Sequence, residues 1–292
     1  MVARSGQELL EICNQKGISL SEYAIQMEME NSESTREQVI NKMRATLKVM
    51  VDSATEGIEK EVYSVTGLIG GDGYRVNEYL KKGETLTGTT TVMAMAMALS
   101  SSEVNASMGR IVACPTAGSC GILPAVILSA GSKLNKTEDE LVMGLFAAAA
   151  VGTIIAMNAT VSGAEGGCQA ECGSAAAMGS AAIVEMMGGS PKMSLDAAAI
   201  VLKNILGLVC DPVAGLVEIP CAKRNAAGAV SALCTADLVM AGVESKIPFD
   251  DMVSAMYKVG KQLPAELRET AMGGVAITKT GLELKKKVFG DE

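Results

Sequence analysis

One long stretch of the chain carries no charge, and it limits the folds that the sequence can adopt. No charged residue lies between Glu140 and Glu165, and the segment from Val142 to Met157 is almost wholly apolar. Its length is sufficient to raise the question of a membrane span. However, it contains more alanine and glycine than leucine and isoleucine, runs into Asn158, and lacks flanking basic residues. We therefore expect a central buried helix and no membrane span.

The sizes of the side chains favour helices throughout. Aromatic residues make up 3% of the 292 residues and tryptophan is absent, whereas alanine, glycine and methionine are abundant. Thin side chains suit closely packed helices better than a strand-rich sandwich. We expect a mostly α fold, a single domain over residues 1–292 with glycine-rich loops around the central helix. An α/β alternative depends on residues 61–69, which could form a short strand or an irregular segment.

Helix boundaries can be predicted from residues that cap backbone amides. Three capping boxes, two further helix starts and two stops predict nine or ten helices. The boxes are Ser19 with Glu22, Ser34 with Glu37, and Thr137 with Glu140; the starts are Pro248 and Ser194; the stops are Gly188–Gly189 and Gly242. Residues 1–60 are polar and periodic, so they could form a helical arm or partner-docking surface, or an amphipathic layer over the core, which we favour.

Charge and the amino terminus exclude some functions. The net charge is −8 and no basic stripe is present, which argues against nucleic-acid binding. The amino terminus is polar and lacks the apolar core of a secretory signal, so we expect a cytoplasmic protein. In that reducing compartment the eight cysteines are better interpreted as buried thiols, redox groups or metal ligands than as disulfides.

The chain contains no histidine, and three of its cysteines lie in glycine- or proline-rich surroundings. Without imidazole, any metal should be held by soft sulfur ligands, and Cys168, Cys210 and Cys221 could hold an iron–sulfur cluster. Cys172 lies four residues after Cys168, so a four-cysteine zinc site is an alternative. The spacing is not that of a zinc knuckle, and inert buried thiols are a third possibility.

A turn-rich loop enters an apolar helix at residues 114–124. The glycines Gly118 and Gly121 would let backbone amides approach a small anion, and Thr116 and Ser119 would add hydroxyl donors. The loop could bind a substrate carboxylate, or it could be a tight turn between packed helices. Two other glycine-rich loops, at residues 66–73 and 162–168, lack the spacing of a nucleotide-binding fingerprint.

Three motifs resemble those of the iron–sulfur-dependent L-serine dehydratases and occur in the same order. They are Pro115–Pro124 (PTAGSCGILP), Glu165–Glu171 (EGGCQAE) and Cys210–Cys221 (CDPVAGLVEIPC). The chain resembles in particular the separate alpha subunit of the two-chain form, over essentially its whole length. The resemblance implies a catalytic domain in which Cys168, Cys210 and Cys221 bind a [4Fe-4S] cluster, and it assigns no ligand position to Cys172, Cys114 or Cys120.

The resemblance also implies a reaction and a partner. The fourth iron of the cluster would act as a Lewis acid on the hydroxyl of L-serine, and the elimination would give pyruvate and ammonia without pyridoxal phosphate. A separate beta subunit would complete the active site. Because the chain has no imidazole and the only lysine beside the motifs is Lys223, we expect the base or a substrate clamp to come from that subunit.

Several polar residues near the motifs are weaker candidates, and two rival functions stay open. Residues that could tune the cluster or simply cap helices are Glu165, Glu171, Asp211 and Glu218; residues that could contact substrate are Asn158, Thr160, Ser162 and Asn225. A related cysteine desulfidase would use the same chemistry on another substrate. A non-catalytic scaffold subunit would use the cysteines only to stabilise its fold.

Overall fold

A computed structural model describes residues 2–290 of the chain, and within them it contains α-helices and short helical turns but no β-strand. The α-helices are α1 (Gly6–Lys16), α2 (Leu20–Ser32), α3 (Arg36–Glu59), α4 (Asp72–Lys81), α5 (Thr89–Ala106), α6 (Ile122–Lys133), α7 (Glu138–Asn158), α8 (Gly163–Gly166), α9 (Ser174–Met186), α10 (Pro191–Ile205), α11 (Cys221–Met240), α12 (Phe249–Gln262) and α13 (Lys279–Phe289). The mostly α fold is therefore confirmed, although residues 2–290 form thirteen α-helices and not nine or ten.

Short helical turns connect these helices, and most of them lie beside the sequence motifs. They are η1 (Ala117–Ser119), the π-turn η2 (Gln169–Gly173), η3 (Val213–Gly215), η4 (Ala265–Leu267) and η5 (Gly274–Ile277). Residues 61–69 form an irregular turn with a single bridge between Tyr63 and Gly70, so the α/β alternative is wrong.

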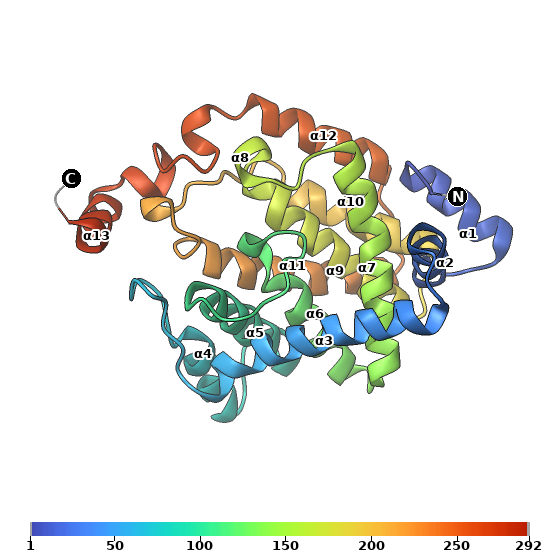
Figure 1. Ribbon diagram of the computed structural model, residues 1–292, viewed down its shortest axis with the longest axis horizontal. Helices are drawn as coiled ribbons and strands as arrows, with labels where there is room; N and C mark the ends of the chain where they lie inside the picture. The colour runs from blue at the N-terminus through green and yellow to red at the C-terminus, as the bar shows by residue number, and fades with distance from the viewer. Residues whose placement is uncertain (1, 291–292) are drawn as a thin grey trace.

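The long uncharged stretch forms α7, which packs against α2, α3 and α9 (Figure 1). No residue from Leu141 to Ile155 is exposed. Within residues 2–290, α7 is the one helix long and apolar enough to cross a membrane. Its neighbours cover it on several sides, as the sequence predicted for a central buried helix.

Thin side chains allow the helices around α7 to approach closely. Helix α9 is buried from Ser174 to Val184 and packs against α6, α7, α10 and α11. Gly179 on α9 lies where an added Cβ would come within 2.7 Å of a methyl carbon of Val126 on α6. The contact between α6 and α9 therefore leaves no room for a side chain at this position. Alanine and glycine therefore determine how tightly this layer closes.

The structure confirms some predicted helix boundaries and corrects others. Thr137 and Glu140 form the predicted capping box, and Pro248 precedes α12. The box predicted at Ser34 is shifted by one residue, because Thr35 pairs with Gln38. Ser194 does not start a helix: it lies inside α10, whose cap is Ser190, followed by proline at the first helical position.

Three helices have their amino-terminal amides bound by carboxylates from distant segments. Glu185 on α9 accepts hydrogen bonds from the amides of Leu20 and Ser21 at 2.8 and 3.2 Å. Asp250 on α12 does the same for the start of α1, and Glu103 on α5 for the start of α4. Because these amides lack partners within their own helix, such contacts fix the outer helices to the core.

Candidate active site

The three predicted cluster cysteines are all buried: Cys168 and Cys221 adjoin helical segments, and Cys210 lies between two of them. Cys168 precedes the π-turn η2, which leads into α9, and such turns are frequent at functional sites. Cys210 lies in the segment after α10, and Cys221 is the first residue of α11. Gln169 joins the first two segments: its amide donates to the Leu208 carbonyl and its side chain accepts from the Gly207 amide, at 3.0 and 2.8 Å.

Cys168 has the most favourable surroundings for a thiolate. Its sulfur lies 3.4 Å from that of Cys172, and both are buried. The hydrogen bond with Cys172 lowers the pKa of Cys168, and the nearby Arg224 lowers it further. Cys172 instead has a pKa well above its ordinary value, because of the same hydrogen bond with Cys168 and because it is buried. Cys172 is thus in contact with the predicted ligand Cys168, although the resemblance assigned it no ligand position.

The negative charge of the Cys168 thiolate helps to raise the pKa values of the other two cysteines. Burial raises the pKa of Cys221 to about 12, with further contributions from Cys168 and Glu171. Burial also raises the pKa of Cys210, and Cys168, Glu171 and Cys221 add to that effect. All three cysteines therefore share one electrostatic environment. All three thiols could ionise together only beside a positive group, and a bound metal cluster would supply one.

A buried ion pair supports the segment around Cys210. The Arg224 Nη1 atom donates to the Val209 carbonyl at 2.9 Å and lies 2.9 Å from the Asp211 Oδ1 atom. The second contact is an ion pair without hydrogen-bond alignment. The other oxygen of Asp211 accepts the Val275 amide at 2.7 Å. Arg224 lies one helical turn after Cys221, a spacing that could have indicated its place.

Glu171 connects the cysteines with the loop at residues 116–121. The Thr116 hydroxyl donates to Glu171 Oε1 at 2.7 Å, and the Cys210 sulfur lies 3.9 Å from Oε2. Burial raises the pKa of Glu171. An added Cβ at Gly163 would lie 2.5 Å from Oε2, and one at Gly118 would lie 2.9 Å from Oε1. A side chain at either position would have to displace this carboxylate.

The loop predicted to bind substrate contains a short helical turn closed by its own hydroxyls. Thr116 Oγ1 lies 3.2 Å from Ser119 Oγ, and Ser119 is buried. The Gly121 amide donates to Asn225 Oδ1 at 2.9 Å, and Asn225 Nδ2 donates to the Gly118 carbonyl at 2.8 Å. Asn225 on α11 thus holds the loop beside Cys221. Any ligand for the Gly121 amide or the Thr116 hydroxyl must exchange with these partners.

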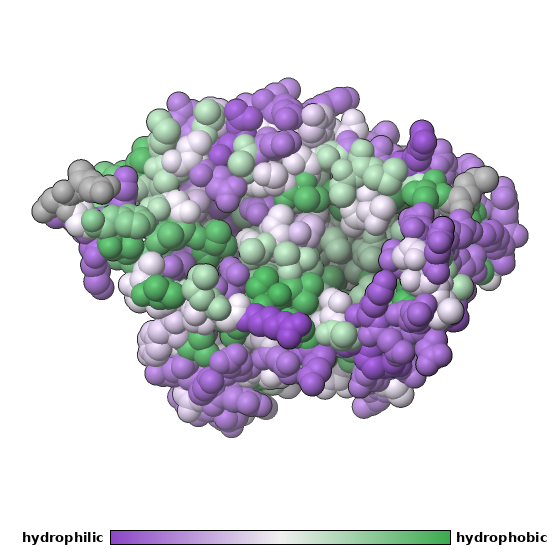
Figure 2. All heavy atoms as spheres, in the orientation of Figure 1, coloured by the Kyte–Doolittle hydropathy of each residue, from purple (hydrophilic) through white to green (hydrophobic). Residues whose placement is uncertain are grey.

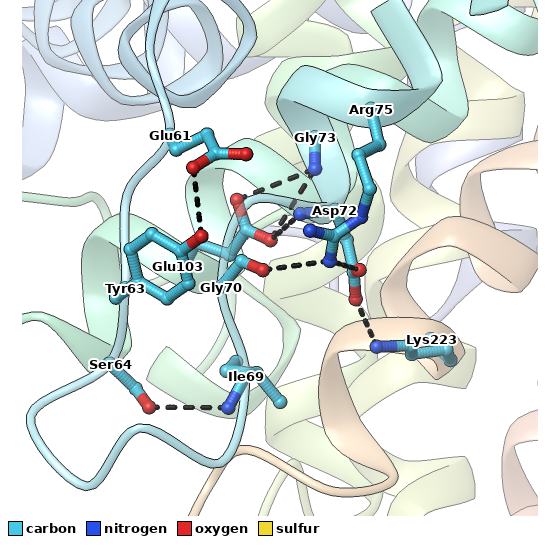
Figure 3. A network of polar contacts seen from close by, with 10 residues as sticks. All are labelled: Glu61, Tyr63, Ser64, Ile69, Gly70, Asp72, Gly73, Arg75, Glu103 and Lys223. Carbon is cyan, nitrogen blue, oxygen red and sulfur yellow. Dashed lines mark hydrogen bonds and ion pairs between the residues drawn. The ribbon is translucent and has the colours of Figure 1, made fainter.

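Lys223, the only lysine beside the motifs, belongs to a different network (Figure 3). Its ammonium pairs with Asp72 on α4, which also pairs with Arg75, and its side chain is 61% exposed. Beneath this surface group, Glu103 is fully buried and accepts the Asp72 amide at 2.6 Å. Burial raises the pKa of Glu103 to about 7. Lys223 therefore links α11 to α4 at the surface.

The remaining predicted residues are spread over the region. Glu218 is buried and accepts the Thr66 hydroxyl at 2.8 Å, which links the Cys210–Cys221 segment to the turn at residues 61–70. Glu165 is exposed and lies 3.7 Å from the ammonium of Lys261. Asn158 caps backbone carbonyls, Thr160 accepts the Ser162 amide, and neither contact involves the cysteines.

The three motif thiols Cys168, Cys210 and Cys221 are the donors available for a metal centre. Among residues 2–290, no three cysteine, aspartate or glutamate side chains are arranged so as to hold one metal ion. A zinc ion needs four ligands that converge on one point, whereas each cysteine of an iron–sulfur cluster binds a different iron. Three buried thiols from three segments, with Gly163 beside Cys210, are compatible with the second arrangement.

Comparison with known proteins places the chain among related sequences. The family model described as "Serine dehydratase alpha chain" matches residues 15–276. A Bacillus subtilis protein named probable L-serine dehydratase, alpha chain, is 50% identical over 98% of this chain and 95% of its own length. The L-serine dehydratase alpha chain of Peptoniphilus asaccharolyticus is 46% identical over 97% of each. L-serine dehydratase 1 of Escherichia coli is 35% identical, over 94% of this chain and 61% of its own length. This chain therefore belongs to the serine dehydratase alpha chain family.

Proposed function

We propose that this chain is the alpha subunit of an L-serine dehydratase, which converts L-serine to pyruvate and ammonia as a step of serine catabolism. One observation carries the proposal: Cys168, Cys210 and Cys221, from distant segments, share one buried site with the loop at residues 116–121. Relatives at 46–50% identity over nearly the whole chain are named for this reaction.

We further propose that Cys168, Cys210 and Cys221 bind a [4Fe-4S] cluster. Three soft, buried sulfur ligands in a chain without histidine favour iron and sulfide over harder metals. When bound, the cluster would supply an iron without a cysteine ligand, which acts as a Lewis acid on the serine hydroxyl. The reaction then needs no pyridoxal phosphate.

In this proposal the chain's own residues orient the substrate. The loop residues Thr116, Gly118, Ser119 and Gly121 bind the carboxylate, since hydroxyls and backbone amides at a helix start favour an anion. Glu171 holds that loop to the cysteine site through the Thr116 hydroxyl. The carboxylate of a bound substrate would exchange with the partners that these groups have now, and the burial of the site would exclude water from the reacting atoms.

The base that removes the substrate's α proton is proposed to come from a partner subunit. The chain has no histidine, and its Lys223 is paired with Asp72. A beta subunit would supply the base or a substrate clamp and complete the site. If the purified chain alone were as active as the two-chain complex, this part of the proposal would be wrong.

We place the enzyme in the cytoplasm, since all eight cysteines are free thiols, which are typical of a reducing compartment.

The first experiment is anaerobic co-expression of the chain with its beta subunit, followed by visible spectroscopy, iron and sulfide analysis, and a pyruvate assay with L-serine. We expect broad iron–sulfur absorption that changes on addition of serine, together with pyruvate. Cys210→Ser should remove iron and activity and leave the helical content unchanged. A colourless, iron-free but folded complex would refute the cluster. Preference for L-cysteine in a competition assay would instead indicate a desulfidase.

A further inference from the structure

The carboxy-terminal segment, residues 264–290, exposes several large apolar side chains. Five of its apolar side chains are between 38% and 65% exposed: Met272, Val275, Ile277, Leu282 and Phe289. Figure 2 shows hydrophobic atoms gathered over α13 and the residues that lead into it, at the left end of the molecule. We call these five residues the C-terminal apolar face. Contiguous exposed apolar surface of this kind is typical of an interaction site.

Helix α13 makes few tertiary contacts with the rest of its own chain. Its main neighbours are the short turns η3 and η5, and Gly281 is its only buried residue. An isolated helix of 11 residues is marginal in water, and most helices are stabilised by burying their apolar side. In α13 that side includes Leu282 and Phe289, which are exposed. The helix therefore lacks the tertiary packing that would normally hold it, and a partner could supply that packing.

Charge indicates what kind of partner fits. Lys279, Lys285 and Lys287 are exposed on α13 beside the apolar side chains, in a protein whose net charge is −8. A second copy of this chain, with its 33 acidic residues, would also complement the basic helix, so self-association has to be measured beside partner binding. A partner with an apolar centre and acidic side chains at its edge matches both properties.

The same segment is hydrogen-bonded directly to Cys210. The Cys210 amide donates to the Leu267 carbonyl at 2.9 Å, and the Cys210 carbonyl accepts the Glu269 amide at 2.7 Å. The Val275 amide donates to Asp211, the next residue along. Both backbone groups of Cys210 thus depend on residues 264–290. Anything that binds the C-terminal apolar face would stiffen the backbone around this cysteine.

From these observations we propose that the C-terminal apolar face binds the companion chain of the two-chain enzyme, and that docking fixes the position of Cys210. The inference depends on the proposed function for the partner's identity. The relatives of equal length are named alpha chains, which implies a second chain. This chain covers 61% of the longer Escherichia coli relative, so the remainder of that protein needs a surface against which to pack.

The test measures association of the purified chain with the beta chain by isothermal titration calorimetry and sedimentation velocity. The variants are Ile277→Asp and Leu282→Asp, and the matched control is Val243→Asp. Val243 is also exposed, but it lies past the far end of α11, a 20-residue helix about 30 Å long that starts at Cys221. Because all three positions are exposed, circular dichroism should report an unchanged helical content.

We expect each face variant to weaken association by roughly 30-fold or more, the effect of losing an interface hot spot, and the control to bind like the unmodified chain. Hydrogen exchange at the Cys210 and Glu269 amides should slow on complex formation. Unchanged binding by both variants, or no binding by the unmodified chain, would overturn the proposal. So would a homodimer that the variants disrupt, or binding to vesicles of anionic lipid through this face. Pyruvate formation by the mixture tests the proposed function separately, so either inference can fail alone.

Discussion

The ion pair between Arg224 and Asp211 offers a quantitative test of how the Cys210 segment is held. The side chains are 18% and 5% exposed, and the two atoms lie 2.9 Å apart. Arg224→Met would leave the Asp211 carboxylate buried without its counter-charge and would remove the donor to the Val209 carbonyl. Breaking a buried pair in this way costs about 3–5 kcal/mol. We expect about 3 kcal/mol, because the contact lacks hydrogen-bond alignment.

The assay is urea unfolding of the reduced chain, followed by circular dichroism. The double variant Asp211→Asn with Arg224→Met should recover much of the loss, since it leaves no unpaired charge and keeps an oxygen for the Val275 amide. The control is Lys81→Met, which breaks an exposed pair with Glu78 and should cost less than about 1 kcal/mol. If Arg224→Met cost no more than this control, the argument for a buried structural pair would fail.

Two further predictions concern Glu103 and Gly163. The pKa of Glu103 is about 7 in the fold against 4.5 for a free carboxyl, so the folded state binds the extra proton and stability falls as pH rises from 4.5 to 7. Glu103→Gln should abolish this contribution, so that its free energy of unfolding falls by about 3 kcal/mol less than that of the unmodified protein between pH 4.5 and 7. The measurement is urea unfolding at several pH values, and parallel plots of unfolding free energy against pH for the two proteins would contradict the prediction. Gly163→Ala crowds Glu171 and Cys210 and should lower iron content, whereas Gly173→Ala, whose added Cβ meets nothing closer than 3.7 Å, should not.

The sequence predicted the fold class because the relevant signals are local. An apolar stretch without charge needs only its own composition to predict a buried helix, and α7 is that helix. The box at Thr137 and the stops at Gly188 and Gly242 depend on residues within one turn of each other. The helix start predicted at Ser194 was wrong because it also depended on a local signal alone. Its hydroxyl suits a cap, but Pro191 had already provided a better start one turn earlier.

The site was predictable only in part. Its cysteines occur in recognisable motifs, but the motifs alone indicate neither the contact between Cys168 and Cys172 nor the place of Glu171 between Thr116 and Cys210. Those contacts join residues 4, 55 and 39 positions apart. The first could be inferred from helical spacing, whereas the other two depend on how helices cross.

The contacts that the sequence hides are also the ones that hold the site together. Cys210 has no regular secondary structure of its own to satisfy its backbone, and it takes both hydrogen bonds from residues 267 and 269. Buried backbone groups must be paired, so displacement of that distant segment would leave a proposed cluster ligand with two unsatisfied groups. A ligand anchored in this way is well placed only while the carboxy-terminal segment stays in position. In the proposed complex, the exposed apolar face of that segment is therefore a point of control over the site, because a partner that buries it would hold Cys210 in place without touching the cysteine itself.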